Sequence, residues 1–165
     1  MKKTAQLVFI LLGITIFAQH GFSTEAYNTV KALTGTKEMK AYFDVNIGEP
    51  MKLLTQLQII ETTYNQVVAS GSSPRFVIGI RGKASNFFTR GEEHVFDSDL
   101  PVKKEIASRI EQFKNQGFRI EQCSIAADMQ EIPVADFLSQ VVVVSNGYIS
   151  MIDYQSQGYA LVPVH

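Results

Sequence analysis

Short apolar runs alternate with longer amphipathic segments along most of the chain. Each run has the length of a β-strand, and the run at 75–80, Arg-Phe-Val-Ile-Gly-Ile, is apolar enough to be buried on both faces of a sheet. The pattern therefore predicts five strands. They fall at 39–45, 75–80, 117–122, 141–144 and 159–162.

The segments between these runs have the character of helices. Pro50 suits the first turn of a helix at 51–70, and Asp99 is a candidate N-cap for a helix at 100–116. A polar loop at 89–98 precedes the second of these helices. Shorter helical pieces are predicted at 83–88, 124–130, 134–138 and 148–157.

The strict alternation of strands and helices decides the expected fold class. Helices of this length between short strands form right-handed crossovers, which connect parallel strands and cover both faces of their sheet. We therefore expect an α/β protein, a three-layer α/β/α sandwich with a mostly parallel five-stranded sheet.

The N-terminus has the pattern of an export signal. Lys2 and Lys3 precede an apolar run at 7–18, which has signal-peptide length and is short for a membrane span. We predict a signal peptide at 1–23, with cleavage after Ser23 or as late as Ala26, and an uncleaved anchor as the alternative. The protein is then periplasmic or secreted, without membrane attachment after cleavage. A polar leader at 27–37 and a single domain at 38–165 follow.

Composition narrows the classes of partner. The chain has 15 basic and 16 acidic residues, a formal net charge of −1 and no basic stripe. Since nucleic-acid binding requires clustered positive charge, no nucleic-acid partner is expected.

Cys123 is the only cysteine of the chain, and it lies where the third predicted strand meets the following helix. In parallel α/β sheets this edge is the usual ligand site, and the free N–H groups of a helix N-terminus stabilise a thiolate. An exported domain with one cysteine has no internal disulfide to form. Cys123 is therefore reactive, paired with another molecule, or a small buried hydrophobic residue.

Other catalytic or cofactor patterns are weak. The histidines His20, His94 and His165 include no pair with metal-ligand spacing, so no metal site is predicted. His94 can pair with Cys123 only if its loop folds over the sheet edge, and a solvated loop histidine is the more frequent case. Residues 79–82 match no phosphate-binding motif, and no cofactor is expected. The carboxylates in and next to this loop are interpreted as solvated surface, with a helix cap at Asp99; they are Glu92, Glu93, Asp97 and Asp99.

Three segments resemble the DsrE/DsrF-like family. They are 121–128 around Cys123, 141–147 and 154–160, and the similarity extends from Met39 to the C-terminus. The resemblance implies a five-stranded parallel sheet and assembly into homo-oligomers. It also implies kinship with proteins that carry sulfane sulfur on a cysteine in sulfur oxidation and tRNA thiolation relays. Cys123 matches the cysteine that follows the third strand of the family pattern.

The chain departs from the family pattern in two respects. Many relatives have a histidine before glycine at the end of the second strand, where this chain has Arg81 and Gly82. Because a guanidinium stays protonated, Arg81 cannot be a general base, but it can stabilise a thiolate, persulfide or oxyanion. The export signal is the second departure, since the well-known relay proteins are cytoplasmic, and it removes tRNA as a partner.

A sulfur carrier needs a partly exposed thiol that ionises readily. Arg81, the Ser124 hydroxyl and the start of the helix at Ser124 are the groups expected to stabilise Cys123 as an anion. Three asparagines at the same edge can orient a small anion, although turn residues more often satisfy local backbone groups. They are Asn46, Asn86 and Asn146.

Two functions of different classes follow. The first is a periplasmic sulfur carrier or sulfurtransferase with a persulfide on Cys123, whose partners are sulfur donor and acceptor proteins or small thiols, because the chain has no resolving cysteine. The second is a non-catalytic oligomeric α/β module that binds a small ligand or a protein, with Cys123 as a packing residue.

Overall fold

The computed structural model describes residues 35–165, so the predicted signal peptide and most of the leader lie outside the described residues. The described chain forms one five-stranded sheet with the order β4-β3-β2-β1-β5, and all neighbouring pairs are parallel. The parallel five-stranded prediction is thereby confirmed. The strands are β1 (Glu38–Val45), β2 (Ser73–Ile80), β3 (Arg119–Cys123), β4 (Val142–Val144) and β5 (Ala160–Val164).

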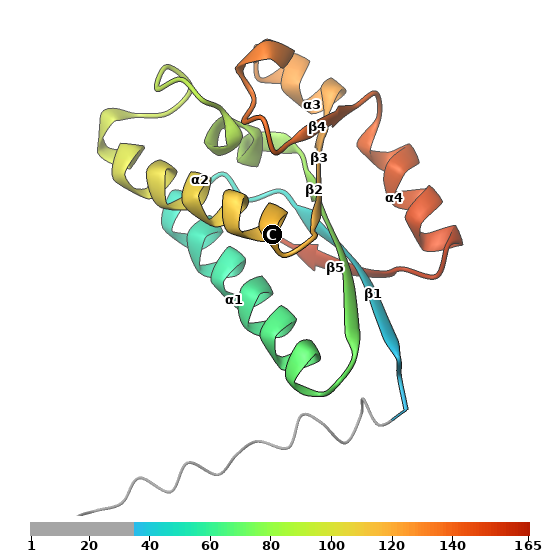
Figure 1. Cartoon of the computed structure of the whole chain (residues 1–165). Helices are drawn as coiled ribbons and strands as arrows, with labels where there is room; N and C mark the ends of the chain where they lie inside the picture. The colour runs from blue at the N-terminus through green and yellow to red at the C-terminus, as the bar shows by residue number, and fades with distance from the viewer. Residues whose placement is uncertain (1–34) are drawn as a thin grey trace, which may run out of the picture.

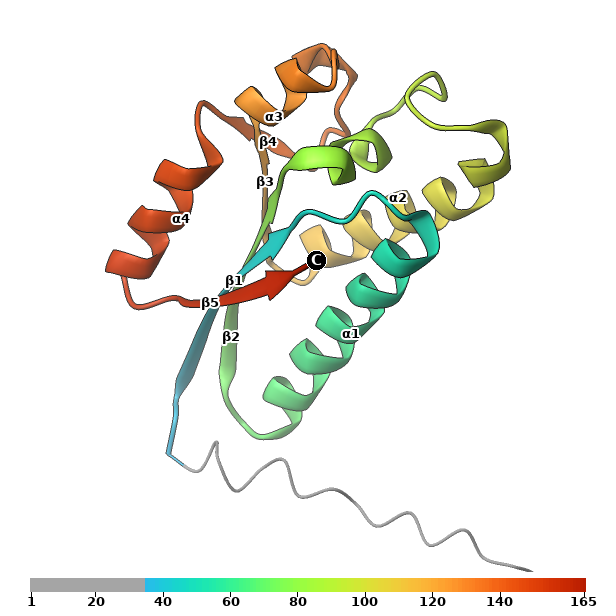
Figure 2. The same ribbon diagram turned by 180° about the vertical axis from the view of Figure 1, so that it is seen from behind.

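The helices form two layers, one on each side of the sheet. Helices α1 (Pro50–Ala69) and α2 (Leu100–Asn115) cover one face, and α4 (Gly147–Ser156) lies on the other (Figures 1 and 2). From β1 to β4 the chain moves across the sheet in one direction, and the step from β4 to β5 reverses it. Because crossovers are right-handed, this reversal places α4 on the opposite face. The three-layer sandwich is therefore confirmed.

Short helices connect the strands near the edge where the strands end. They are α3 (Ser124–Met129) and the 3₁₀ helices η2 (Gly82–Phe88), η3 (Asp97–Asp99) and η4 (Val134–Asp136). The prediction of Asp99 as the N-cap residue of α2 is confirmed. Its side chain makes no cap hydrogen bond, and its carboxylate accepts from the Ser98 hydroxyl at 3.2 Å.

Strand pairing extends several strands beyond their predicted boundaries, as β2 and β3 illustrate. β2 begins at Ser73 rather than at residue 75, because Ser73 and Pro74 still pair with Glu38 and Met39 of β1. β3 extends to Cys123, which pairs with Val144 of β4. The thiol therefore belongs to the last residue of a strand.

The two faces of the sheet differ in chemistry. Side chains alternate along β1, so that Phe43 and Val45 pack into the apolar core, while Tyr42 contacts Tyr154 of α4 and Asp44 lies on the same side as Tyr42. Each fully buried core side chain contributes about 1.5–3 kcal/mol to stability. The α4 side instead buries polar groups, among them Asp44 and Glu121. None of the helices in residues 35–165 is long and apolar enough to cross a membrane.

Candidate functional site

Cys123 lies beneath the first turn of α4. Its residue is 8% exposed, and its Sγ accepts a hydrogen bond from the backbone N–H of Gly147, the first residue of that helix, at 3.2 Å. A helix N-terminus carries a partial positive charge, so this contact stabilises an anionic sulfur. The sequence predicts this role for the helix that begins at Ser124, but the donor to the sulfur comes from α4.

A glycine is required where α4 approaches the cysteine. A Cβ atom built on Gly147 would lie 2.9 Å from the Cβ of Cys123 and 3.4 Å from its Sγ. Carbon atoms at the first of these separations overlap, so any side chain at this position would push α4 away from β3. Gly147 therefore allows the helix N–H to reach the sulfur.

Ser124 and Asn146 hold the segment that carries Gly147. The Ser124 hydroxyl donates to the carbonyl of Ser145 at 3.0 Å, and the Asn146 side chain accepts from the backbone N–H of Tyr148 at 2.9 Å, which caps α4. Both side chains are thus bonded to the backbone, and the Ser124 hydroxyl does not donate to Cys123. Their role in the structure is to position the N-terminus of α4.

Arg81 directly follows β2, the strand next to β3. Ile80 pairs with Gln122, so Arg81 and Cys123, each one residue further along the chain, are at the same level of the sheet edge. The guanidinium donates from Nε and Nη2 to the two carboxylate oxygens of Asp44, at 2.5 and 2.6 Å, and lies over the ring of Tyr148 at 5.4 Å. The hydrogen bond to Asp44 raises the pKa of Arg81, so a role as general base is excluded.

Sequence reasoning missed Asp44 as part of this site. Asp44 is 6% exposed and belongs to a strand that is otherwise largely apolar near its end. An aspartate in such a strand indicates a buried ion pair, because a buried carboxylate needs a charged or hydrogen-bonding partner. The partner, Arg81, is 37 residues away and is brought beside it by the pairing of β1 with β2.

The other two predicted asparagines lie apart from the sulfur. Asn46 follows β1, and a Cβ atom on Gly82 would overlap its Oδ1, so its amide packs against the start of η2. Asn86 lines a pocket of about 470 Å³ together with Lys83, and Cys123 is not among the lining residues. The structure therefore brings Arg81, Ser124 and Asn146 towards Cys123 and its helix, and places Asn86 at a neighbouring hollow.

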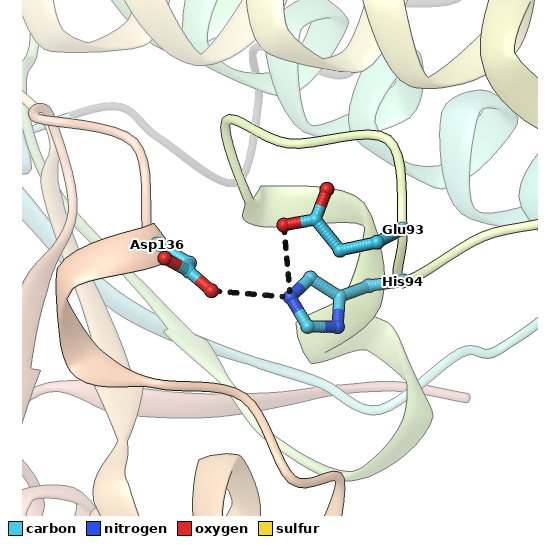
Figure 3. Close-up of side chains that lie close together, drawn as sticks. All are labelled: Glu93, His94 and Asp136. Carbon is cyan, nitrogen blue, oxygen red and sulfur yellow. Dashed lines mark hydrogen bonds and ion pairs between the residues drawn. The ribbon is translucent and has the colours of Figure 1, made fainter.

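His94 is neither a solvated loop residue nor a partner of Cys123. Its side chain is 13% exposed, and Nε2 lies 3.4 Å from Oδ2 of Asp136 and 3.8 Å from Oε1 of Glu93 (Figure 3). Glu93 is 61% exposed, so its carboxylate is solvated as predicted, and it also lies beside His94. The contact joins residues 42 apart, and no local spacing in the sequence indicates it.

A buried carboxylate fixes α4 to the sheet. Glu121 of β3 is 3% exposed, accepts hydrogen bonds from the Ser150 hydroxyl and, at 3.2 Å, from the Tyr154 hydroxyl, and contacts Arg119 at 2.9 Å. Burial, and secondarily the charge of Glu121, raise the pKa of Tyr154 to about 12. Burial likewise raises the pKa of Tyr42 well above its usual range. Both phenols are thus held neutral in the fold.

This network predicts destabilisation in alkali. The pKa of Tyr154 is near 10 when unfolded and about 12 when folded, so its contribution is present below pH 10 and is lost as the pH rises towards 12. We expect the urea midpoint to fall over this interval, and to fall less in Tyr154→Phe. An equal fall in both proteins would show that Tyr154 has no part in the effect.

Comparison with known proteins identifies relatives by sequence. The model of the DsrE/DsrF-like family matches residues 15–164. An uncharacterised protein of Aquifex aeolicus (strain VF5) is 28% identical over 127 residues, which make up 76% of this chain and 56% of that protein. The chain thus spans about half the length of this curated relative.

Solved structures show the same fold at low sequence identity. The protein of unknown function MTH1491 from Methanobacterium thermoautotrophicum matches with a TM-score of 0.61 and 18% identity, covering 76% of this chain and 98% of that one. The ychN protein of E. coli matches with a TM-score of 0.54 and 13% identity, with the same coverage. At these identities the likeness establishes the fold.

Proposed function

The chain belongs to the DsrE/DsrF-like family, and from this premise we propose that it is a sulfur carrier that binds sulfane sulfur as a persulfide on Cys123. Membership of the family supports a role related to sulfur relay. The observation that carries the proposal is the position of Cys123, at the end of β3 with its sulfur on the first N–H of α4. This N–H stabilises the anionic sulfur from which transfer begins.

The transfer consists of two substitutions at sulfur. In loading, the Cys123 thiolate attacks the sulfane sulfur of the donor, an S–S bond forms to Cys123, and the donor leaves as a thiolate or, from thiosulfate, as sulfite. In unloading, an acceptor thiolate attacks the outer sulfur, and Cys123 leaves as the thiolate. The same N–H that stabilises the attacking sulfur also stabilises the leaving one.

Arg81 has an electrostatic role in this proposal. Nε and Nη2 are bonded to Asp44, while Nη1 has no hydrogen-bond partner among the described residues. The Arg81 side chain is 25% exposed and at the level of Cys123, so Nη1 is available to an anionic donor such as thiosulfate. Because Arg81 cannot accept a proton, the thiol proton is lost to solvent or to the donor.

We extend the proposal to location and assembly. The predicted signal peptide favours export, and therefore a periplasmic carrier that exchanges sulfur with donor and acceptor proteins or small thiols. The family resemblance implies homo-oligomers. Self-association with a second copy is further supported by large apolar side chains left exposed on α3 and α4. These are Ile125, Met129, Tyr148, Ile149 and Ile152.

Intact-mass spectrometry of the purified full chain tests the carrier. After incubation with thiosulfate, polysulfide or glutathione persulfide, we expect wild type to gain the mass of one or more sulfur atoms and to lose it again with a thiol reductant. Cys123→Ser should gain none. Ser139→Ala serves as the control, because this exposed serine lies outside the groups that position α4 and its replacement leaves the thiol in place.

A second function is favoured by one observation. Cys123 is only 8% exposed, and the polar side chains nearest to it are bonded to protein groups, as expected of a binding module in which the cysteine packs the core. Failure of every donor to load the protein, together with failure of iodoacetamide to label native Cys123, would exclude the carrier and identify Cys123 as a packing residue, as the binding module requires.

A further inference from the structure

We propose that Glu93, His94 and Asp136 form a binding site for a divalent first-row transition cation such as Zn²⁺. The site is separate from Cys123, and the inference does not depend on the sulfur-carrier proposal. Its ligand atoms would be the imidazole Nε2 of His94 and one oxygen from each carboxylate, and these atoms all lie within 4.8 Å of one another (Figure 3).

The distances suit ligands around an ion better than hydrogen bonds. The Nε2 atom of His94 is 3.4 Å from the Asp136 carboxylate and 3.8 Å from that of Glu93, whereas N–H···O bonds are about 2.7–3.2 Å long. Two ligand atoms each about 2.1 Å from a tetrahedral Zn²⁺ are about 3.4 Å apart. A small movement of the exposed Glu93 side chain towards His94 would bring all three ligand atoms to coordination distance from one ion.

The charge of the cluster also favours a cation. Both carboxylates face the same imidazole nitrogen, which carries at most one proton and donates well to one of them. Within residues 35–165, the only ion-pair contact of Glu93 and of Asp136 is His94. Lys103, the nearby buried cation, instead donates to the Thr89 hydroxyl and the Gly91 carbonyl. A divalent ion would balance the two negative charges.

The backbone fixes the two segments that supply the ligands. Thr89 and Phe137 form an antiparallel bridge, the Arg90 N–H donates to the Asp136 carbonyl at 2.7 Å, and the Leu138 N–H donates to the Phe88 carbonyl at 3.0 Å. Since the ligand-bearing loop and η4 are joined in this way, the three side chains are held near one another before any ion binds. Such preorganisation lowers the cost of binding.

The site also has access to solvent and to small ligands. Glu93 and His94 line the pocket of about 470 Å³, whose other polar residues include Lys83, Asn86 and Gln130. Three protein ligands leave at least one coordination position of a tetrahedral ion free, as in catalytic rather than structural zinc sites. Water or a small anion in the pocket can occupy that position, with Lys83 as a further positive charge.

Titration of the chelator-treated full chain with Zn²⁺ tests the proposal. We expect one Zn²⁺ per chain in calorimetry, and a Co²⁺ complex whose spectrum lacks a thiolate charge-transfer band. His94→Ala and Glu93→Gln should each weaken binding by about ten-fold or more, since even loss of an outer-shell partner costs 10–100-fold. His165→Ala and Cys123→Ser are the matched controls and should bind as wild type does.

Two results would overturn the site. One is the absence of Zn²⁺ binding by wild type below about 1 mM. The other is binding that His94→Ala and Glu93→Gln leave unchanged while a control variant weakens it, which would place the ion elsewhere. Circular dichroism checks the fold of each variant. Glu93→Gln keeps the test decisive if His94→Ala does not fold, because the Glu93 side chain is 61% exposed.

Discussion

Replacing Asp44 with alanine is expected to lower the free energy of unfolding by about 3 kcal/mol, the lower end of the range for breaking a buried ion pair. The Asp44 side chain is 8% exposed, and its loss leaves the Arg81 guanidinium without the partner of two of its nitrogens. The 25% exposure of Arg81 lets water replace part of this interaction. Urea unfolding followed by circular dichroism measures the change.

The chain contains a matched control for this prediction. Glu38 and Arg75 join β1 to β2 near the other end of the strands, with the same separation of 37 residues, but both side chains are exposed. Glu38→Ala should therefore change stability little, because solvent screens exposed pairs. Equal losses of unfolding free energy in Asp44→Ala and Glu38→Ala would contradict the claim that the Asp44–Arg81 pair stabilises the protein more because it is buried.

Replacing Gly147 with valine is expected to cost about 1–3 kcal/mol of stability, the usual penalty of overpacking a closely packed site. The added Cβ would lie 2.9 Å from the Cβ of Cys123, so the first turn of α4 must move away from β3. The same movement takes the Gly147 N–H from the sulfur, and we expect slower sulfur loading of Cys123 by glutathione persulfide in intact-mass measurements.

A double-mutant cycle with Gly147→Ala isolates the contact between the added Cβ atom and Cys123. In Cys123→Gly the opposing Cβ atom is absent, so Gly147→Ala should cost less stability in that background than in wild type. Additive effects of the two substitutions would mean that the glycine is needed for some reason other than its approach to Cys123.

Local chemistry determined the elements of this protein and the edge where the candidate site lies. Apolar runs of strand length, Pro50 at the start of α1 and the break at Gly117 act over a few residues, and the predicted elements match those observed within one or two positions for most boundaries. The alternation of strand and helix then fixed a parallel sheet, because right-handed crossovers leave little choice. The carboxyl end of the third strand, and so Cys123, followed from this alternation.

Contacts between distant segments decided what the side chains at that edge do. Arg81 is held by Asp44 and Tyr148, and the sulfur receives its hydrogen bond from Gly147 rather than from the helix that directly follows it. These contacts depend on the register of the strands and on which face of the sheet α4 covers. The residues next to Arg81 or Cys123 in the sequence determine neither the register nor the position of α4.

The cluster around His94 likewise depends on contacts between distant segments rather than on local sequence. As a single histidine in a polar loop, it has no local spacing that indicates a ligand set, and Asp136 comes from a segment 42 residues further along. Backbone contacts between distant segments, among them the bridge between Thr89 and Phe137, bring the two together. The sequence by itself therefore determined the fold and the place of the thiol, through periodicity and chain connectivity. The tertiary structure alone decided the partners of each charged group, because ion pairs form between residues that are close in space at any distance along the chain.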